Sequence, residues 1–227
     1  MERRGQTHML QQYKTVYQES VHEIIEKKSR FIANVFPVKS PEDAAHCVEQ
    51  VRKRHAGANH HCFAYVLGEQ FQTQRCVDDG EPSQTAGKPI LDVLLGKEIH
   101  DTLIVVTRYF GGTLLGTGGL VRAYGRAAKE GLLASTIITK VYGGICYIKI
   151  DYNEVGKVQY LLGQEELLIV NSEYSDVVKI EVLIPAADAK RIQAELIEKT
   201  NGKIQIEKIE ECYFARVGKA VEIFSDS

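Results

Sequence analysis

Apolar and polar positions alternate in the first part of the chain in a way that predicts five strands and three helices. The first helix opens at Pro41 with Ser40 as its N-cap. Residues Leu103 to Val106 are apolar on both faces, which indicates a central strand covered from both sides. The predicted strands are 22–27, 30–38, 61–67, 71–77 and 103–106, and the predicted helices begin at residues 41, 90 and 120.

The pattern in the second part of the chain predicts strands and helices in the order β-α-β-β-α-β, which is the ferredoxin-like arrangement. This part contains no glycine-rich loop and no histidine, so we expect a docking module for a protein partner. The predicted strands are 141–150, 167–174, 177–184 and 203–212, and the predicted helices are 152–162 and 187–200.

The two patterns together predict an α+β fold of two domains, and 227 residues suffice for two separate cores. We place the first domain at 9–136 and the second at 137–215. Residues 1–8 are interpreted as a leader or cloning-derived segment, and residues 216–227 as a tail.

Composition narrows the class of protein. The five cysteines are widely spaced without a C-x-x-C pair, which argues against a disulfide framework and a zinc site. No apolar run approaches the roughly 20 residues of a membrane span, and no signal peptide is recognised. We therefore expect a cytoplasmic protein without a membrane partner. The net charge is −2, so affinity for nucleic acid would have to come from a local basic patch.

An acidic turn, VDDGEPSQTAGKP, occupies residues 77–89. Its three carboxylates are close enough in sequence to hold Mg²⁺, or they cap the backbone of their own turn. They alternatively face arginines across a cleft in charge-assisted pairs that fix the loop. We interpret the turn as a loop that shapes a cleft, with His60 nearby. The residues assigned to this loop are Asp78, Asp79, Gly80, Glu81, Ser83, Thr85 and Lys88, and the metal alternative uses Asp78, Asp79 and Glu81.

A glycine-rich segment follows the apolar strand and precedes a helix. This order places free backbone N–H groups and the helix dipole where they favour a phosphate or carboxylate. The spacing matches neither a P-loop nor G-x-G-x-x-G, and the alternative is that the glycines serve close packing. The predicted phosphate ligands are Arg108, Tyr109, Gly111, Gly112, Gly116, Gly118, Gly119, Arg122 and Arg126.

Basic residues share one side of the helix that follows the glycines. At 100° per residue, Arg122, Arg126 and Lys129 fall together, while Tyr124 falls on the apolar side. Such a face tracks a phosphate backbone, or it is ordinary solvated surface. The aromatic residues beside Arg108 are suited to stacking on bases, and they equally fit the edge of a core.

Evidence for a catalytic nucleophile is weak. Ser83 and Thr85 have no histidine at a spacing that implies pairing. His60 and Cys62 share one face of a strand, which allows a thiol–imidazole pair. The alternative is that Cys62 fills the core and His60 makes hydrogen bonds beside the site.

Three segments together resemble the IMPACT/YigZ family: ANHHCFAY, DDGEPSQTAGKP and RYFGGTLLGTGGLVRAYGRA. The resemblance extends over nearly all of 9–212. It implies a first domain like the second domain of ribosomal small-subunit protein five and a ferredoxin-like second domain. The family motif falls here on His60, Asp78, Asp79, Gly80, Glu81, Pro82, Ala86, Gly87, Arg108, Tyr109, Phe110, Gly111, Gly112, Gly116, Gly118, Gly119, Arg122 and Tyr124.

The resemblance also guides the functional expectation. Eukaryotic relatives look like regulators of translation, acting partly through an extra N-terminal domain that this chain lacks. The folds link the bacterial type to RNA or the ribosome by analogy. Our leading hypothesis is therefore a non-enzymatic translation protein, without a cofactor, that binds RNA, the ribosome or a nucleotide phosphate. The rival is a small-molecule phosphotransferase or hydrolase that uses the acidic loop with Mg²⁺.

Overall fold

The computed structural model describes residues 10–218 and 220–224, without the side chains of 208 and 209. The chain forms two compact units, one of them Tyr13–Ile138. The other contains the described residues from Thr139 onward, together with the described residues that precede Tyr13. The division lies two residues beyond the predicted boundary at 136. The leader predicted at 1–8 lies outside the described residues. No helix in the described part of the chain is long and apolar enough to cross a bilayer.

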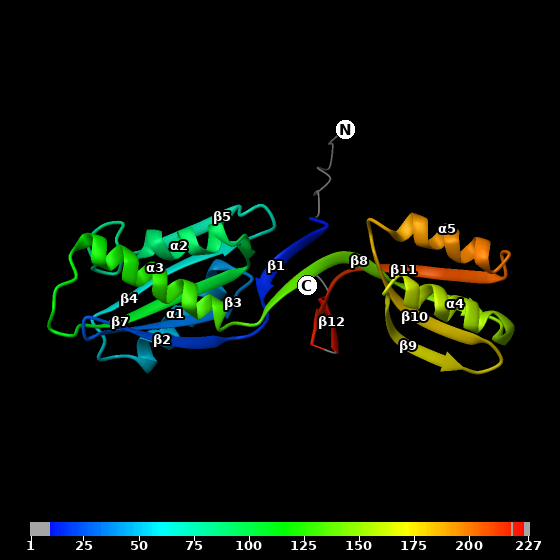
Figure 1. Cartoon of the computed structure of the whole chain (residues 1–227), viewed down its shortest axis with the longest axis horizontal. Coiled ribbons are helices and arrows are strands. Elements are labelled where there is room, and N and C mark those ends of the chain that lie inside the picture. Colours follow the sequence, from blue (N-terminus) through cyan, green and yellow to red (C-terminus); the bar gives the residue numbers. More distant parts are fainter. Residues whose placement is uncertain (1–9, 219, 225–227) are drawn as a thin grey trace, which may run out of the picture. The chain divides into compact units, whose positions relative to one another are not determined.

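The N-terminal unit is built on a five-stranded sheet in the order β2-β3-β7-β4-β5, with every neighbouring pair antiparallel. Strand β7 lies at the centre and is almost entirely buried, as its apolar sequence predicts. Helix α1 covers one face of this sheet, and helices α2 and α3 cover the other (Figure 1). The elements are β2 (Ser20–Glu26), β3 (Ser29–Pro37), α1 (Pro41–Arg54), β4 (His60–Leu67), β5 (Thr73–Val77), α2 (Gly87–Gly96), β7 (Thr102–Tyr109) and α3 (Thr117–Leu133).

Three features of this unit differ from the sequence prediction. Helix α3 begins at Thr117 and not at residue 120, because Gly116 takes φ 72° and the two following glycines join the first helical turn. Helix α2 begins at Gly87, three residues before its predicted start at 90. Strands β1 (Gln12–Val16) and β6 (Ile99–His100) form a short parallel pair that is too brief for its pattern to be recognised.

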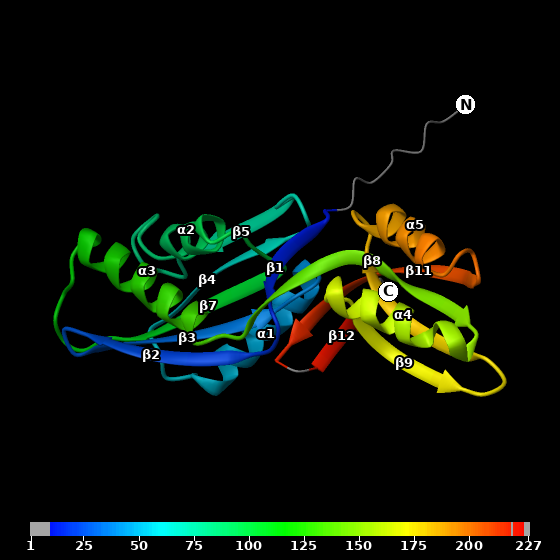
Figure 2. The ribbon, with the colours of Figure 1, turned by 45° about the vertical axis from the view of Figure 1, so that its right-hand side comes forward.

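The C-terminal unit confirms the ferredoxin-like prediction, with four strands in the order β9-β10-β8-β11 and every neighbouring pair antiparallel. Helices α4 and α5 pack on one face of this sheet (Figure 2). The prediction of a tail at 216–227 is wrong for the residues described there, which belong to β11 and β12 apart from Gly218. Gly218 takes φ 62° in a tight turn, so the chain reverses and β12 pairs with β11. The elements are β8 (Ile137–Ile150), α4 (Tyr152–Gln164), β9 (Leu168–Tyr174), β10 (Val178–Pro185), α5 (Ala189–Lys199), β11 (Ile204–Val217) and β12 (Ala220–Phe224).

Two glycines of the C-terminal unit should respond in opposite directions to substitution by alanine. A methyl group at Gly143 would overlap the carbonyl oxygen of Ile184, whereas one at Gly156 in helix α4 would meet no atom within 4 Å. We expect Gly143→Ala to destabilise the protein by about 1–3 kcal/mol. Gly156→Ala should stabilise it by about 0.5–1 kcal/mol. Urea unfolding would measure both, and equal effects would contradict the packing described for Gly143.

Candidate functional site

A pocket of about 460 Å³ opens where the acidic turn, the glycine-rich segment and the end of strand β7 come together. We call it the α3 pocket. Glu81 and Pro82 come from the acidic turn, and Gly116 and Thr117 come from the glycine-rich segment. Two segments more than 30 residues apart in sequence therefore share one pocket. The other lining residues are Asn59, His60, Arg108, Phe110, Leu114, Leu115 and Leu120.

The polar wall of the α3 pocket is a buried cluster around the carboxylate of Glu81. Its Oε1 accepts a hydrogen bond from Arg108 Nη1 at 2.6 Å and another from the Tyr124 hydroxyl at 2.7 Å. Glu81 is 9% exposed and Arg108 5%. Burial raises the pKa of Tyr124, so this hydroxyl remains a donor. The pairing of Glu81 with an arginine is one of the charge-assisted pairs predicted from sequence, and it is confirmed.

His60 completes this wall. Its Nδ1 lies 2.9 Å from the carbonyl oxygen of Asp79, which can only accept, so Nδ1 carries the proton. The other ring nitrogen, Nε2, lies 3.8 Å from Glu81 Oε1. In the neutral ring, Nε2 is therefore an acceptor.

The two aspartates of the acidic turn hold the backbone and do not line the pocket. Asp78 accepts from the backbone N–H groups of Gln84, Ala86 and Gly87, at 2.8–3.0 Å, where helix α2 begins. Asp79 accepts from the N–H of His61 and forms an ion pair with Arg52 at 2.8 Å. For Asp78 this is the capping alternative of the sequence analysis, whereas the partners of Asp79 lie outside the turn.

The Mg²⁺ alternative needs Asp78, Asp79 and Glu81 to converge on one point. No group of three such ligands is placed to hold a metal ion within 10–218 and 220–224. The oxygens of the two aspartates are already used by the backbone and by Arg52. The geometry therefore argues against this alternative.

The glycine-rich segment presents the N-terminus of helix α3 to the pocket. The N-cap is Gly116, and no side chain caps the helix. The first intrahelical bond runs from Leu120 N to Gly116 O, so the N–H groups of Thr117, Gly118 and Gly119 have no intrahelical partner. The guanidinium of Arg122 lies beside Gly118: its Nη1 is 4.0 Å from the position that a Cβ on Gly118 would occupy. Arg122 forms no ion pair with another residue of the described part of the chain.

The first two glycines of the segment have structural roles. A side chain at Gly111 would overlap the backbone of Lys28 in the β2–β3 turn, and Gly111 N donates to Ser29 Oγ at 3.1 Å. Gly112 takes φ 82°, a value that L residues rarely adopt. Neither residue lines the α3 pocket. We attribute these two glycines to close packing and turn geometry, which is the alternative to phosphate binding given in the sequence analysis.

Two predicted ligands point elsewhere. Side chains alternate along β7, so Tyr109 faces away from Arg108 and Phe110 and lies against His55 and Arg30 on the opposite side of the sheet. Arg126 lies one turn beyond Arg122 and pairs with Glu130 at 2.7 Å and with Glu26 at 3.8 Å. Neither residue lines the α3 pocket.

The remaining residues of the acidic loop are outside the pocket too. The hydroxyl of Thr85 donates to the carbonyl oxygen of Pro82 at 2.6 Å, which tightens the turn. Lys88 forms an ion pair with Asp92 within helix α2. Ser83 is exposed, and Gly80 takes φ 86° beside the ring of His60.

The Cys62 thiol is fully buried and is not arranged for nucleophilic attack. Its Sγ donates to the carbonyl oxygen of Asp78 at 2.9 Å and contacts the Tyr124 hydroxyl at 3.4 Å. Burial raises the pKa of this thiol far above its ordinary value, so it stays protonated. Cys62 is therefore a core residue, which was the alternative reading.

Sequence reasoning missed the apolar part of the pocket. Leu114 is 82% exposed, and Leu115 and Leu120 continue the same wall. Isolated leucines in a glycine-rich loop carry no periodic signal. Tyr124 was assigned to the packing side of α3, and its ring does pack there against Phe31, but its hydroxyl also belongs to the Glu81 cluster.

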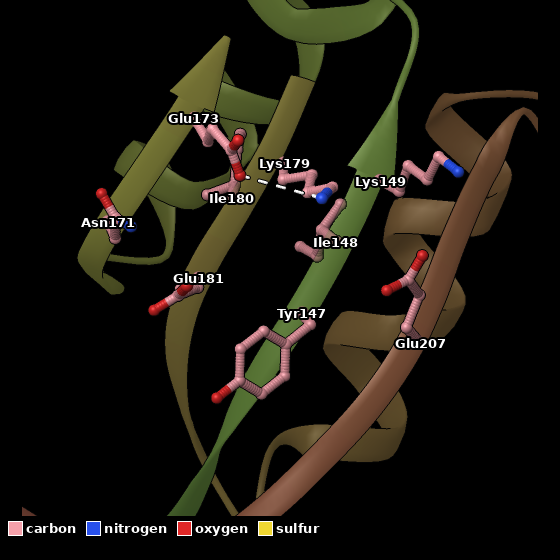
Figure 3. Close-up of a pocket in the computed structure, with 9 residues that line it drawn as sticks. All are labelled: Tyr147, Ile148, Lys149, Asn171, Glu173, Lys179, Ile180, Glu181 and Glu207. Atoms are coloured by element: carbon pink, nitrogen blue, oxygen red, sulfur yellow. Dashed lines mark ion pairs between the residues drawn. The ribbon is translucent and has the colours of Figure 1, made fainter. Parts of the chain in front are cut away.

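The C-terminal unit has a hollow of about 320 Å³ that is lined by residues 149–151, 177, 202, 203 and 205. It also has a hollow of about 50 Å³ on the sheet surface (Figure 3). Its lining carries charges of both signs, including the ion pair of Glu173 and Lys179 at 3.8 Å. This surface shows no converging reactive groups. The expectation that this unit docks a protein partner stays a prediction.

Comparison with known proteins gives two family matches. Residues 27–132 match the Impact N-terminal domain family, and residues 148–203 match a domain of unknown function, DUF1949. A solved structure described as a hypothetical protein aligns with a TM-score of 0.58 and 36% sequence identity. The alignment covers 89% of this chain and 99% of that one.

Similar proteins extend over most of the chain. IMPACT family member YvyE of Bacillus subtilis is 38% identical, with coverage of 92% of this chain and 96% of the relative. IMPACT family member YigZ of Escherichia coli is 40% identical, with coverage of 82% and 92%. Protein IMPACT of Bos taurus is 35% identical over 41% of this chain and 30% of its own length. The animal protein therefore shares only a segment with this chain.

Proposed function

The chain belongs to the IMPACT family, and on this premise we propose that it is a non-catalytic, cytoplasmic protein linked to translation that binds RNA at the α3 pocket. The link to translation rests on the family resemblance. The binding role rests on one observation, the uncapped N-terminus of helix α3, which opens onto an apolar pocket. Arg122 lies beside it and forms no ion pair with any residue that the structure describes.

The phosphate of the ligand belongs at the first turn of α3. Three backbone N–H groups lie there, together with the positive end of the helix dipole. A bound anion accepts hydrogen bonds from these N–H groups and is stabilised by the dipole. Arg122 adds a full positive charge beside Gly118. Arg108 supplies no net charge, because it is buried against Glu81.

The apolar part of the α3 pocket suits a base. Phe110 is 45% exposed at the pocket, and the leucines 114, 115 and 120 form the adjoining wall. Stacking of a base on an exposed aromatic ring is a common source of affinity for single-stranded RNA. A phosphate site next to an aromatic surface therefore favours a nucleotide over a free inorganic anion.

The arrangement of titratable groups supports binding without catalysis. Asp78 and Asp79 hold backbone groups, and Glu81 is tied to Arg108 and Tyr124. The Cys62 thiol is buried and protonated. The two aspartates and this thiol are therefore committed to the fold, and so is Oε1 of Glu81.

Two substitutions test the phosphate site. Arg122→Ala should weaken binding of a single-stranded RNA about tenfold, because it removes a charge-assisted contact. The substitution should also reduce the magnitude of the slope of log binding constant against log salt concentration by about 1. Thr117→Pro should weaken binding as well, since it deletes one N–H at a helix position that accepts proline. Filter binding at several salt concentrations would measure both effects.

The matched control is Lys53→Ala. Lys53 lies in helix α1, which covers the opposite face of the sheet, and its ion pair with Glu49 is exposed. We expect its RNA affinity and salt slope to equal those of the unaltered protein. If Arg122→Ala binds RNA with the same affinity and the same salt slope as Lys53→Ala, the α3 pocket is not the RNA site.

A further inference from the structure

We infer that the α3 pocket selects a base with an exocyclic amino group and therefore prefers cytosine to uracil. Glu81 and His60 are the residues that make this choice. The inference deepens the proposed function and rests on it, since it concerns which base accompanies the phosphate bound at helix α3.

Charge decides which part of a nucleotide can approach the polar wall. The Glu81 carboxylate is buried, and its ion pair with Arg108 leaves no positive charge in excess there. A phosphate at this wall would face a carboxylate in a low-dielectric environment, which is unfavourable. The phosphate therefore stays at the first turn of α3, and a neutral part of the nucleotide faces Glu81.

Glu81 and His60 each offer a free acceptor at the polar wall, while Nε of Arg108 is buried and has no hydrogen-bond partner among the described residues. Oε1 of Glu81 already accepts from Arg108 and Tyr124, while Oε2 accepts no hydrogen bond from any described residue. His60 Nε2 is a second acceptor, because the ring proton is on Nδ1, which donates a hydrogen bond to the carbonyl oxygen of Asp79. A ligand group that faces two acceptors has to be a donor.

An exocyclic amino group satisfies both acceptors at once. It carries two N–H groups, one for Glu81 Oε2 and one for His60 Nε2, and these two residues lie close together, with 3.8 Å between His60 Nε2 and Glu81 Oε1. Uracil presents a carbonyl oxygen at the equivalent position, which would face two acceptors without a proton between them. A carboxylate that accepts from cytosine N4 is a known pairing in base recognition.

The aromatic ring of Phe110 supports this orientation. Arg108 Cζ lies 5.6 Å from the centroid of that ring, so the polar wall and the stacking surface adjoin each other. A base that stacks on Phe110 can direct its edge at Glu81. Adenine and guanine also carry amino groups, but cytosine and uracil have the same size, so this pair isolates the effect of the amino group.

The test compares oligo(C) with oligo(U) of equal length on the full-length protein at pH 7.5. We expect oligo(C) to bind about tenfold more tightly, which is within the range of one good base contact. Equal affinities would overturn the inference and leave the proposed function intact. If neither oligonucleotide binds, the proposed function fails and the inference fails with it.

Glu81→Gln provides a second measurement. The amide oxygen should take the place of Oε1, because Arg108 and Tyr124 both donate, and the amide NH₂ then replaces the free acceptor. We expect the preference to invert in favour of oligo(U). An unchanged preference for oligo(C) in a folded variant would overturn the role of Glu81.

If the circular dichroism spectrum shows that Glu81→Gln does not fold, Phe110→Ala replaces it. The side chain of Phe110 is half exposed, so the fold should tolerate its loss. We expect affinity for both oligonucleotides to fall about tenfold, because stacking is lost. Unchanged binding of oligo(C) would place the base outside the α3 pocket and overturn the inference.

Discussion

Glu81→Ala is expected to lower the free energy of unfolding by about 3–5 kcal/mol. The substitution leaves the guanidinium of Arg108, which is 5% exposed, without its counter-charge. The Tyr124 hydroxyl loses its acceptor as well. Removal of one partner from a buried ion pair is among the most destabilising changes available, since the remaining charge has no solvent to replace the lost contact.

Urea unfolding followed by circular dichroism would measure this loss. The matched control is the double variant Glu81→Leu with Arg108→Met, which removes both charges and keeps most of the buried volume. We expect it to recover a large part of the lost stability, because apolar replacement of a whole buried ion pair is often nearly neutral. A double variant as unstable as Glu81→Ala would show that the uncompensated charge is not the cause.

Asp78→Ala should cost about 2–3 kcal/mol, because one carboxylate satisfies three backbone N–H groups. Two of these groups, from Ala86 and Gly87, are at the start of helix α2, where the N-cap residue Ala86 provides no side-chain acceptor. Asp78 therefore caps a helix that begins nine residues after it. The loss of the carboxylate should loosen the acidic turn and the first turn of α2 together.

Ser83→Ala is the matched control for this turn. Ser83 is exposed, and no side-chain hydrogen bond is described for it, so the change should stay within about 0.5 kcal/mol. Amide hydrogen exchange at the start of α2 would locate the effect of Asp78→Ala. If protection there were unchanged, Asp78 would not be the cap of this helix.

Much of the fold could be predicted because the strands have strong periodic patterns. Residues 103–106 predict the buried centre of the sheet, and the β-α-β-β-α-β order predicts the C-terminal unit. The prediction failed where local signals were short or ambiguous. Strand β6 has two residues, and the glycines before α3 indicate a loop although Gly118 and Gly119 belong to the first helical turn.

The site was predictable only in part, because it depends on which way each side chain points. Strand alternation alone places Arg108 and Phe110 on one face and Tyr109 on the other. The sequence was therefore sufficient to exclude Tyr109 from the phosphate ligands. The ion pairs of Arg126 with Glu130 and Glu26 depend on how α3 packs against its neighbours. No sequence pattern indicates that Leu114 lines a pocket.

The double role of Glu81 constrains how this protein can evolve. The same carboxylate lines the α3 pocket, where we propose that the ligand binds, and neutralises an arginine in the interior. A mutation of Glu81 that changes ligand specificity also lowers the stability of the fold, so the two effects cannot be selected separately. New specificities in this lineage should therefore arise through coupled changes at positions 81, 108 and 124, a case of epistasis set by a single buried contact.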